Sequence, residues 1–173
     1  MALLAEGILK THWDQTVPVN LARIAKGMGL AVRLGETGDA CAILEITAQR
    51  KARVIIDRTH PITRQRYGVA HALAHLALHH LRPGMRHRIR ISDTYHANHS
   101  LRQDSEANDF ALRLLMPEEA LRYSVEQRHA RTAEEVAHLF DVPEMLVKQR
   151  MADLDLYFPK TLAQQLNPTE IWD

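Results

Sequence analysis

Two histidines four residues apart are the part of this sequence best suited to chemistry. His71 and His75 stand in the order His-Ala-Leu-Ala-His, and residues four apart project from the same face of a helix. Two imidazoles placed in this way can bind one tetrahedral zinc ion. In zinc proteases with this spacing, the residue after the first histidine is a glutamate, which accepts a proton from the water that the zinc activates. Here that residue is Ala72, whose methyl group can neither accept nor donate a proton.

A carboxylate further along the chain is a candidate third ligand. Glu106 lies near the start of an amphipathic helix expected over about 104–116, next to its apolar face. Two histidines and one glutamate leave the fourth tetrahedral position for water, as in a catalytic zinc site. An acid in the first turn of a helix is also favoured by the helix dipole alone, and the pattern does not choose between these explanations. Manganese or iron could also occupy such a site.

Two neighbours of the histidine pair are further catalytic candidates. Tyr67 lies one turn before His71, where a hydroxyl could stabilise an oxyanion. His79 lies one turn beyond His75 and could orient a ligand, receive a proton or bind substrate. Simpler explanations are favoured for both, namely aromatic packing for Tyr67 and a favourable helix dipole for His79.

The spacing of apolar residues predicts the elements that must position these groups. It indicates helices over about 2–13 and 20–28, strands over 30–34, 40–47 and 52–57, and a helix over about 63–81 that carries both histidines. The second and third strands flank a polar turn and predict a β-hairpin. The histidine helix is apolar nearly all round, so we expect it to be buried. Residues 82–100 form an irregular, Arg- and His-rich segment, in which alternation over 88–91 is typical of a short edge strand.

Helices are expected to fill the C-terminal half. They are predicted over about 104–116, 118–128, 133–140 and 143–154, and Thr132 begins a capping box for the third. The fold class expected is therefore α/β (α+β), with a small antiparallel or mixed sheet packed on the histidine helix. We divide the chain into a metallopeptidase-like domain, residues 1–130, and a C-terminal helical subdomain and tail, residues 131–173.

Composition excludes several other classes of protein. The chain has 173 residues and a formal net charge of +1, and its C-terminal helix pair has nearly balanced charge, so direct nucleic-acid binding is not expected. No stretch approaches the roughly 20 apolar residues that cross a bilayer, and no membrane partner is expected. The single cysteine fits a reducing compartment, so we expect a cytoplasmic protein. Eight of the eleven histidines fall within residues 60–99, and we interpret most of these as solvated loop residues.

Two motifs together resemble a known family. They are Tyr67-Gly-Val-Ala-His71-Ala-Leu-Ala-His75 and Glu106-Ala-Asn-Asp-Phe-Ala, the latter running on to Met116-Pro117. Over about residues 17–156 the sequence resembles the ImmA/IrrE family of zinc metallopeptidases. The resemblance implies that His71, His75 and Glu106 are the metal ligands and that the general base falls at Ala72. It also implies a partner, because family members typically cleave an XRE-family helix-turn-helix repressor encoded nearby and so switch on stress or mobile-element genes.

Ala72 departs from the family pattern and predicts impaired activity. A positioned general base contributes roughly 10²–10⁴-fold to rate. Three explanations are open: a deliberate Glu-to-Ala replacement, a natural non-catalytic member that kept its metal, or a substitute base such as His79, His80 or a loop histidine. We favour the first, because the rest of the constellation is intact. The alternative function is a binding protein that sequesters a repressor or toxin–antitoxin partner without cleavage. A transcription factor that uses the C-terminal helices is a weaker third hypothesis.

Overall fold

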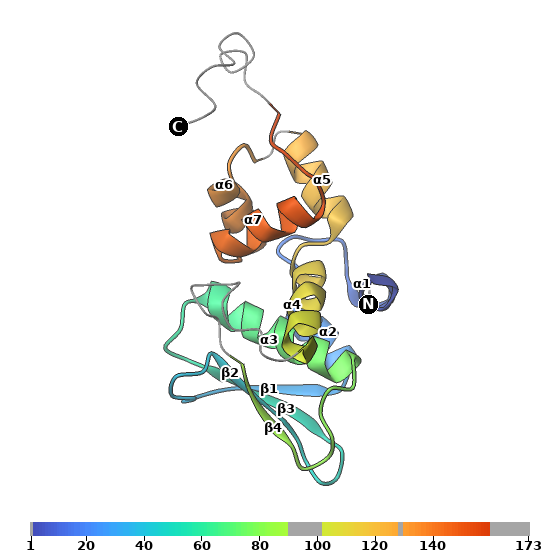
Figure 1. The fold of residues 1–173 in the computed structure, drawn as a ribbon, viewed down its shortest axis with the longest axis vertical. Coiled ribbons are helices and arrows are strands. Elements are labelled where there is room, and N and C mark those ends of the chain that lie inside the picture. Colours follow the sequence, from blue (N-terminus) through green and yellow to red (C-terminus); the bar gives the residue numbers. More distant parts are fainter. Residues whose placement is uncertain (1, 90–101, 128–129, 160–173) are drawn as a thin grey trace.

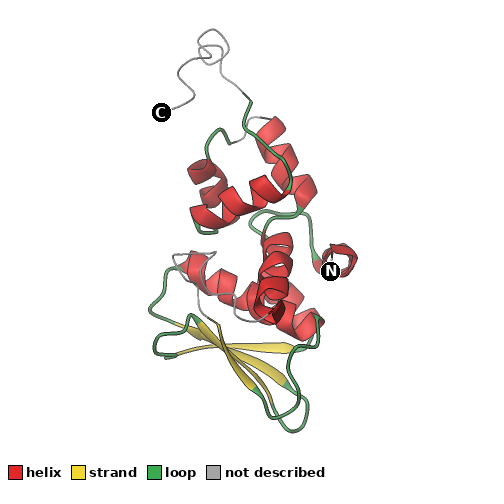
Figure 2. Ribbon diagram, in the orientation of Figure 1, coloured by secondary structure: helices red, strands yellow, loops and turns green. Residues whose placement is uncertain are grey.

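The computed structural model describes residues 2–89, 102–127 and 130–159. Within these residues one sheet forms one side of the molecule, and the helices lie on its other side (Figure 1). Figure 2 shows the same two layers by secondary structure: the helix Ile62–Ala77 (α3) lies on the strands and Arg102–Leu115 (α4) packs on it. Helices Glu118–Glu126 (α5), Ala133–Phe140 (α6) and Glu144–Asp153 (α7) are further from the sheet. The predicted α+β class is confirmed.

The sheet contains four strands in the order β1-β3-β2-β4. They span Leu30–Gly35 (β1), Ala42–Ile46 (β2), Ala52–Asp57 (β3) and Arg86–Ile89 (β4). β1 pairs with β3 in parallel, whereas β2 pairs antiparallel with both β3 and β4. The sheet is therefore mixed, and the predicted β2–β3 hairpin is confirmed. β4 begins earlier than expected, and the rest of the predicted 88–91 strand lies outside the described residues.

Pleating gives the sheet one buried and one open face. Ala42, Leu44 and Ile46 of β2 are buried beneath the helices, because alternate residues of a strand point to the same face. On the open face, Glu45 accepts a hydrogen bond from the guanidinium of Arg53 at 2.8 Å. Residues that are paired directly across two strands point to the same face of the sheet, so the pairing register decides which residues of a neighbouring strand face the helices.

Of the three N-terminal helices, the second and third pack on the sheet, whereas the first packs on the second and on a later helix. They span Ala2–His12 (α1), Leu21–Gly27 (α2) and Ile62–Ala77 (α3), and α3 packs on β2 and β3. Gly68 allows the close approach of α3, because a Cβ at this position would lie 3.0 Å from the Cβ of Ala42. Asn20 caps α2 by accepting a hydrogen bond from the Arg23 amide, and Gly29 follows with φ 71°, as expected of a helix stop.

The histidine helix ends earlier than predicted. Its last residue is Ala77 rather than Leu81, because His79 adopts a left-handed conformation with φ 55°. The amide of His80 then donates to the carbonyl of His75 at 3.0 Å, and that of His79 donates to Leu76 at 3.3 Å. This pair of bonds is the Schellman ending of a helix. It turns the chain back so that the ring of His80 meets the ring of His75.

Within the described residues of the C-terminal half there are four helices, as predicted. They span Arg102–Leu115 (α4), Glu118–Glu126 (α5), Ala133–Phe140 (α6) and Glu144–Asp153 (α7). Thr132 caps α6 by accepting a hydrogen bond from the Glu135 amide, which confirms this half of the capping box, whereas the Glu135 carboxylate accepts from the amide of Arg131 rather than from that of Thr132. α4 packs across α3 and also contacts α7, where the side chain of Arg150 donates to the carbonyl of Met116 at 3.3 Å.

The buried apolar residues of both halves form one continuous core. The proposed division at residue 130 stays a prediction, and residues 160–173 of its second part lie outside the described residues. Among the helices that the structure describes, none is both long and apolar enough to cross a membrane.

Candidate metal centre

Four metal-ligating side chains meet where α3, β4 and α4 come together. They are His71 and His75 of α3, His87 of β4 and Asp104 of α4. Each offers one nitrogen or oxygen atom, and these four atoms lie within 4.8 Å of one another. His71 and His75 are only 3% and 2% exposed, so the group lies inside the protein rather than on a wet surface.

Each element positions its side chain for a simple reason. His71 and His75 are one helical turn apart on the face of α3 that meets α4. In β4, His87 stands opposite Leu44 of β2 and therefore points to the buried face of the sheet. In α4, Asp104 is one turn before the buried Asn108 and so lies on the same inward face.

The distances match what one metal ion requires. Nε2 of His71 lies 3.0 Å from Nε2 of His75, which lies 3.3 Å from Oδ1 of Asp104. Nε2 of His87 lies 3.1 Å from the same oxygen. Ligands about 2.0–2.1 Å from a tetrahedral ion are about 3.3 Å apart, since a tetrahedron's edge is about 1.6 times its radius. The donors are thus spaced as ligands of a shared ion.

The carboxylate of Asp104 supplies an independent test of that fit. Its Oδ1 atom is buried, yet it has no hydrogen-bond partner among the described residues, although two imidazole nitrogens are within 3.3 Å. Neither contact has the geometry of a hydrogen bond, so the nitrogen and oxygen atoms converge without satisfying one another. A buried, unsatisfied carboxylate oxygen is costly. A divalent cation bound among these donors would remove that cost, and a metal cofactor therefore fits this group.

A second layer of contacts orients His71. The hydroxyl of Tyr67 donates to Oδ1 of Asn108 and lies 3.0 Å from Nδ1 of His71. Because this hydroxyl proton is used on Asn108, the tyrosine oxygen accepts the proton of Nδ1. The proton-free Nε2 of His71 then faces the group, which is the form that binds a metal. Tyr67 is 3% exposed, so its position is fixed by packing.

His75 is oriented by a similar series of contacts through His80 to Glu106. Its Nδ1 lies 3.0 Å from Nδ1 of His80, whose Nε2 lies 3.4 Å from Oε2 of Glu106. Burial, together with the nearby imidazoles of His71, His87 and His80, lowers the pKa of His75 to about 2. His75 is therefore neutral at pH 7, and its contact with Asp104 is not an ion pair. A neutral imidazole has the lone pair that a metal needs.

Glu106, the predicted third ligand, does not belong to the four-residue group. Its carboxylate accepts a hydrogen bond from Arg102 at 2.7 Å, which lowers its pKa, and it reaches the group only through His80. The physical reason is helical phase, because two residues along a helix rotate a side chain by about 200°. The side chains of Asp104 and Glu106, which are 29% and 26% exposed, therefore leave the helix in different directions, and that of Asp104 belongs to the four-residue group. The sequence signal that favours Asp104 is its spacing of four residues from Asn108, which places both on one face of the helix.

His87 was the other residue that sequence reasoning did not assign to the site. The Arg- and His-rich composition around it predicts a solvated loop, but His87 belongs to β4, where it and the fully buried Ile89 alternate with exposed arginines. That alternation is present in the sequence, displaced by two residues from the strand that was predicted. Its spatial partner could not be predicted, since only the pairing of β4 with β2 brings it over α3.

The remaining candidates are close to the group but outside it. The hydroxyl of Tyr67 contacts Nδ1 of His71, whereas Nε2 of His71 faces the other donors. This contact favours a role for Tyr67 in orienting the His71 ring. His79 is exposed and serves the helix end through its backbone. Ala72 is fully buried beside His71. Its methyl group gives this side of the site no proton acceptor.

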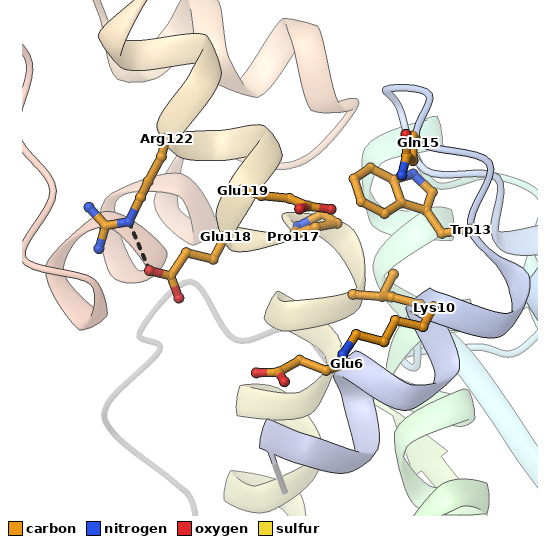
Figure 3. Close-up of a pocket in the computed structure, with 9 residues that line it drawn as sticks. Glu6, Lys10, Trp13, Gln15, Pro117, Glu118, Glu119 and Arg122 are labelled. Carbon is orange, nitrogen blue, oxygen red and sulfur yellow. Dashed lines mark hydrogen bonds and ion pairs between the residues drawn. The ribbon is translucent and has the colours of Figure 1, made fainter.

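A separate pocket of about 560 Å³ opens between α1 and the start of α5 (Figure 3). Trp13 and Gln15 form one wall, and Pro117 and Glu119 face them from the other. None of the four clustered donors lines it. It is larger than the hollow of about 220 Å³ that His75 and His79 help to line, but it contains none of the clustered donors, so we place the functional site at the histidines.

Comparison with known proteins fits this geometry. No curated protein matches the chain at a significant level. Residues 27–152 match a peptidase family described as the IrrE N-terminal-like domain, and this range includes α3, β4 and α4, the three elements that supply the clustered donors. The match covers most of the chain and agrees with the resemblance seen in its motifs. The chain therefore belongs to the ImmA/IrrE family of metallopeptidases.

Proposed function

We propose that this chain binds zinc through His71, His75 and Asp104, and that it is a family peptidase whose hydrolytic step is impaired at Ala72. The observation that carries this proposal is that ligand atoms of His71 and His75 lie within 4.8 Å of a carboxylate oxygen of Asp104, whose buried Oδ1 atom has no hydrogen-bond partner among the described residues. Two histidines and one carboxylate are a ligand set found in catalytic zinc sites.

The protein side of the mechanism follows from the contacts. Zinc would supply Lewis acidity, which polarises a peptide carbonyl and acidifies water. His71 is held in its metal-binding tautomer by Tyr67, and His75 is held by His80. Proton transfer to the leaving amine would need a carboxylate at position 72, where only a methyl group is present. Binding and orientation are therefore retained, whereas movement of the proton is not.

Two of the alternative bases, His79 and His80, follow the end of α3 and are poorly placed to replace that carboxylate. His79 is exposed and outside the donor group. His80 is engaged by His75 on one ring nitrogen and by Glu106 on the other. This favours impaired hydrolysis over a substitute base from these two residues. It also supports the second candidate function, a binding protein that retains a partner without cutting it.

We propose an XRE-family helix-turn-helix repressor, encoded beside this chain, as the protein partner. Family membership supports this partner. Hydrolysis would then remove the repressor, whereas binding without hydrolysis would sequester it.

The test compares Ala72→Glu with Ala72→Gln, a matched control of the same size that lacks the carboxylate. Each protein is loaded with zinc and mixed with the neighbouring repressor, and fragments are followed by mass spectrometry. The Glu variant should cleave at one site roughly 10²–10⁴-fold faster than the Gln variant or the parent chain. A stable complex without cleavage by any variant would favour the binding protein. If neither cleavage nor a stable complex is detected, the proposed partner is refuted.

A further inference from the structure

We propose that His87 is a fourth protein ligand, which closes the metal site in the resting protein. This inference rests on the proposed metal site and adds to it, because two histidines and one acid would leave the fourth position open. Strand β4 would then belong to the metal centre, and access to the metal would require His87 to leave.

Strand pairing holds His87 in place. β4 pairs with β2 in a register that sets His87 opposite the fully buried Leu44, and Ile89 opposite Ala42. The two arginines of β4 point the other way. Arg86 lies 3.5 Å from Glu45 on the open face, and Arg88 donates to the carbonyl of Thr37 at 2.7 Å. These contacts fix the alternation of the strand, so His87 is directed toward α3 and α4.

The ring of His87 lies at ligand distance from the other donors. Its Nε2 is 3.1 Å from Oδ1 of Asp104, which is slightly closer than the 3.3 Å between that oxygen and His75. Its ring centroid is 4.4 Å from that of His75, and its plane is within 4° of parallel to His71. Asp104 is therefore approached by imidazoles from the helix and from the sheet. One ion among them would satisfy Asp104, His75 and His87 at once.

Closure has a chemical consequence. Zinc sites with four protein ligands are structural, whereas catalytic sites keep one position for water or substrate. With His87 bound, all four tetrahedral positions are filled by this chain. The side chain of His87 is 23% exposed, compared with 1% for His75, so it is the imidazole that solvent or a peptide can most readily replace. The chain would thus lack an open position as well as the base missing at Ala72.

The test measures metal binding rather than activity. Zinc affinity is determined by competition with a chelator for the parent chain, His87→Ala and His87→Phe, of which the last keeps a ring but lacks a lone pair. Loss of a ligand should weaken zinc binding by more than the 10–100-fold typical of an outer-shell change. His138→Ala is the matched control, since this histidine is 82% exposed on α6, and its zinc affinity should equal that of the parent chain.

Cobalt absorption supplies a second readout. The Co²⁺-loaded parent chain should show a four-coordinate spectrum that added azide does not change, whereas azide should shift the spectrum of both His87 variants. Circular dichroism tests whether the variants are folded. If His87→Ala does not fold, the conservative His87→Phe variant is used for both measurements. A combined Ala72→Glu, His87→Ala chain should also cleave peptide faster than Ala72→Glu alone.

The outcomes separate this inference from the proposed function. Tight zinc binding by the parent chain with equal affinity in folded His87 variants would overturn the fourth ligand and leave the three-ligand site standing. An azide-sensitive spectrum in the parent chain would also overturn it. Failure of the parent chain to bind zinc would refute the metal site itself, and the role of His87 with it.

Discussion

Replacing Asp104 by Asn should raise the stability of the metal-free protein and abolish most of its stabilisation by zinc. The substitution keeps the size of the side chain and removes the charge. Glu106→Gln is the matched control, because it makes the same chemical change two residues away on the same helix. The two variants distinguish the carboxylate that the structure places among the imidazoles from the one that the sequence favoured.

The magnitudes follow from the contacts of each residue. An unsatisfied buried acceptor costs about 1–3 kcal/mol, and the lower end applies because the Asp104 side chain is 29% exposed. Metal-free Asp104→Asn should therefore gain about 1 kcal/mol, or about 2–4 °C in Tm for a chain of this size. Zinc at 100 times its Kd adds about 2.7 kcal/mol to the parent protein, or about 5–10 °C. A 100-fold weaker Kd reduces this gain to about 0.4 kcal/mol, whereas a tenfold weaker one leaves about 1.4 kcal/mol.

Thermal unfolding with and without zinc, at equal protein concentration, measures both effects. The parent chain and Glu106→Gln should show clear zinc-dependent shifts, with the smaller shift in Glu106→Gln, because this residue reaches the site only through His80. Asp104→Asn should show almost none. If Glu106→Gln loses the zinc shift and Asp104→Asn keeps it, the assignment from helical phase is wrong.

Three further substitutions test the supporting structure. Tyr67→Phe should weaken zinc binding by about 10–100-fold in competition titrations, because it removes the acceptor for Nδ1 of His71; an unchanged Kd would show that this hydroxyl does not orient the ring. Hydrogen bonds from two threonines lower the pKa of Asp57, so the stability that this carboxylate contributes is present above about pH 4 and is lost as pH falls through its folded-state pKa. Urea midpoints of Asp57→Asn should accordingly fall less on acidification than those of the parent chain, and parallel curves would contradict this. Thr132→Ala removes the cap of α6 and should lower the free energy of unfolding by about 0.5–2 kcal/mol, whereas equal urea midpoints would mean that the cap contributes little.

Much of the fold was predictable because local patterns determine it. The apolar spacing of α3, the alternation in β2 and β3 and the capping box at Thr132 each express a preference of a few neighbouring residues. The end of α3 was predicted less well. Pro83 and Gly84 are strong breakers, but the helix stops at Ala77 because His79 adopts a left-handed conformation, which histidine adopts less readily than glycine.

The sequence alone determined the pair of histidines on one helical face, the alanine at position 72 and the family that these motifs indicate. Spacing along one helix fixes such features, so no distant residue is needed to see them. Only the tertiary structure decided which other side chains lie in the candidate metal centre. Asp104 and His87 join the pair because α4 crosses α3 in one rotational phase and β4 pairs with β2 in one register. Both depend on packing between segments far apart in the chain, which local residue preferences do not specify.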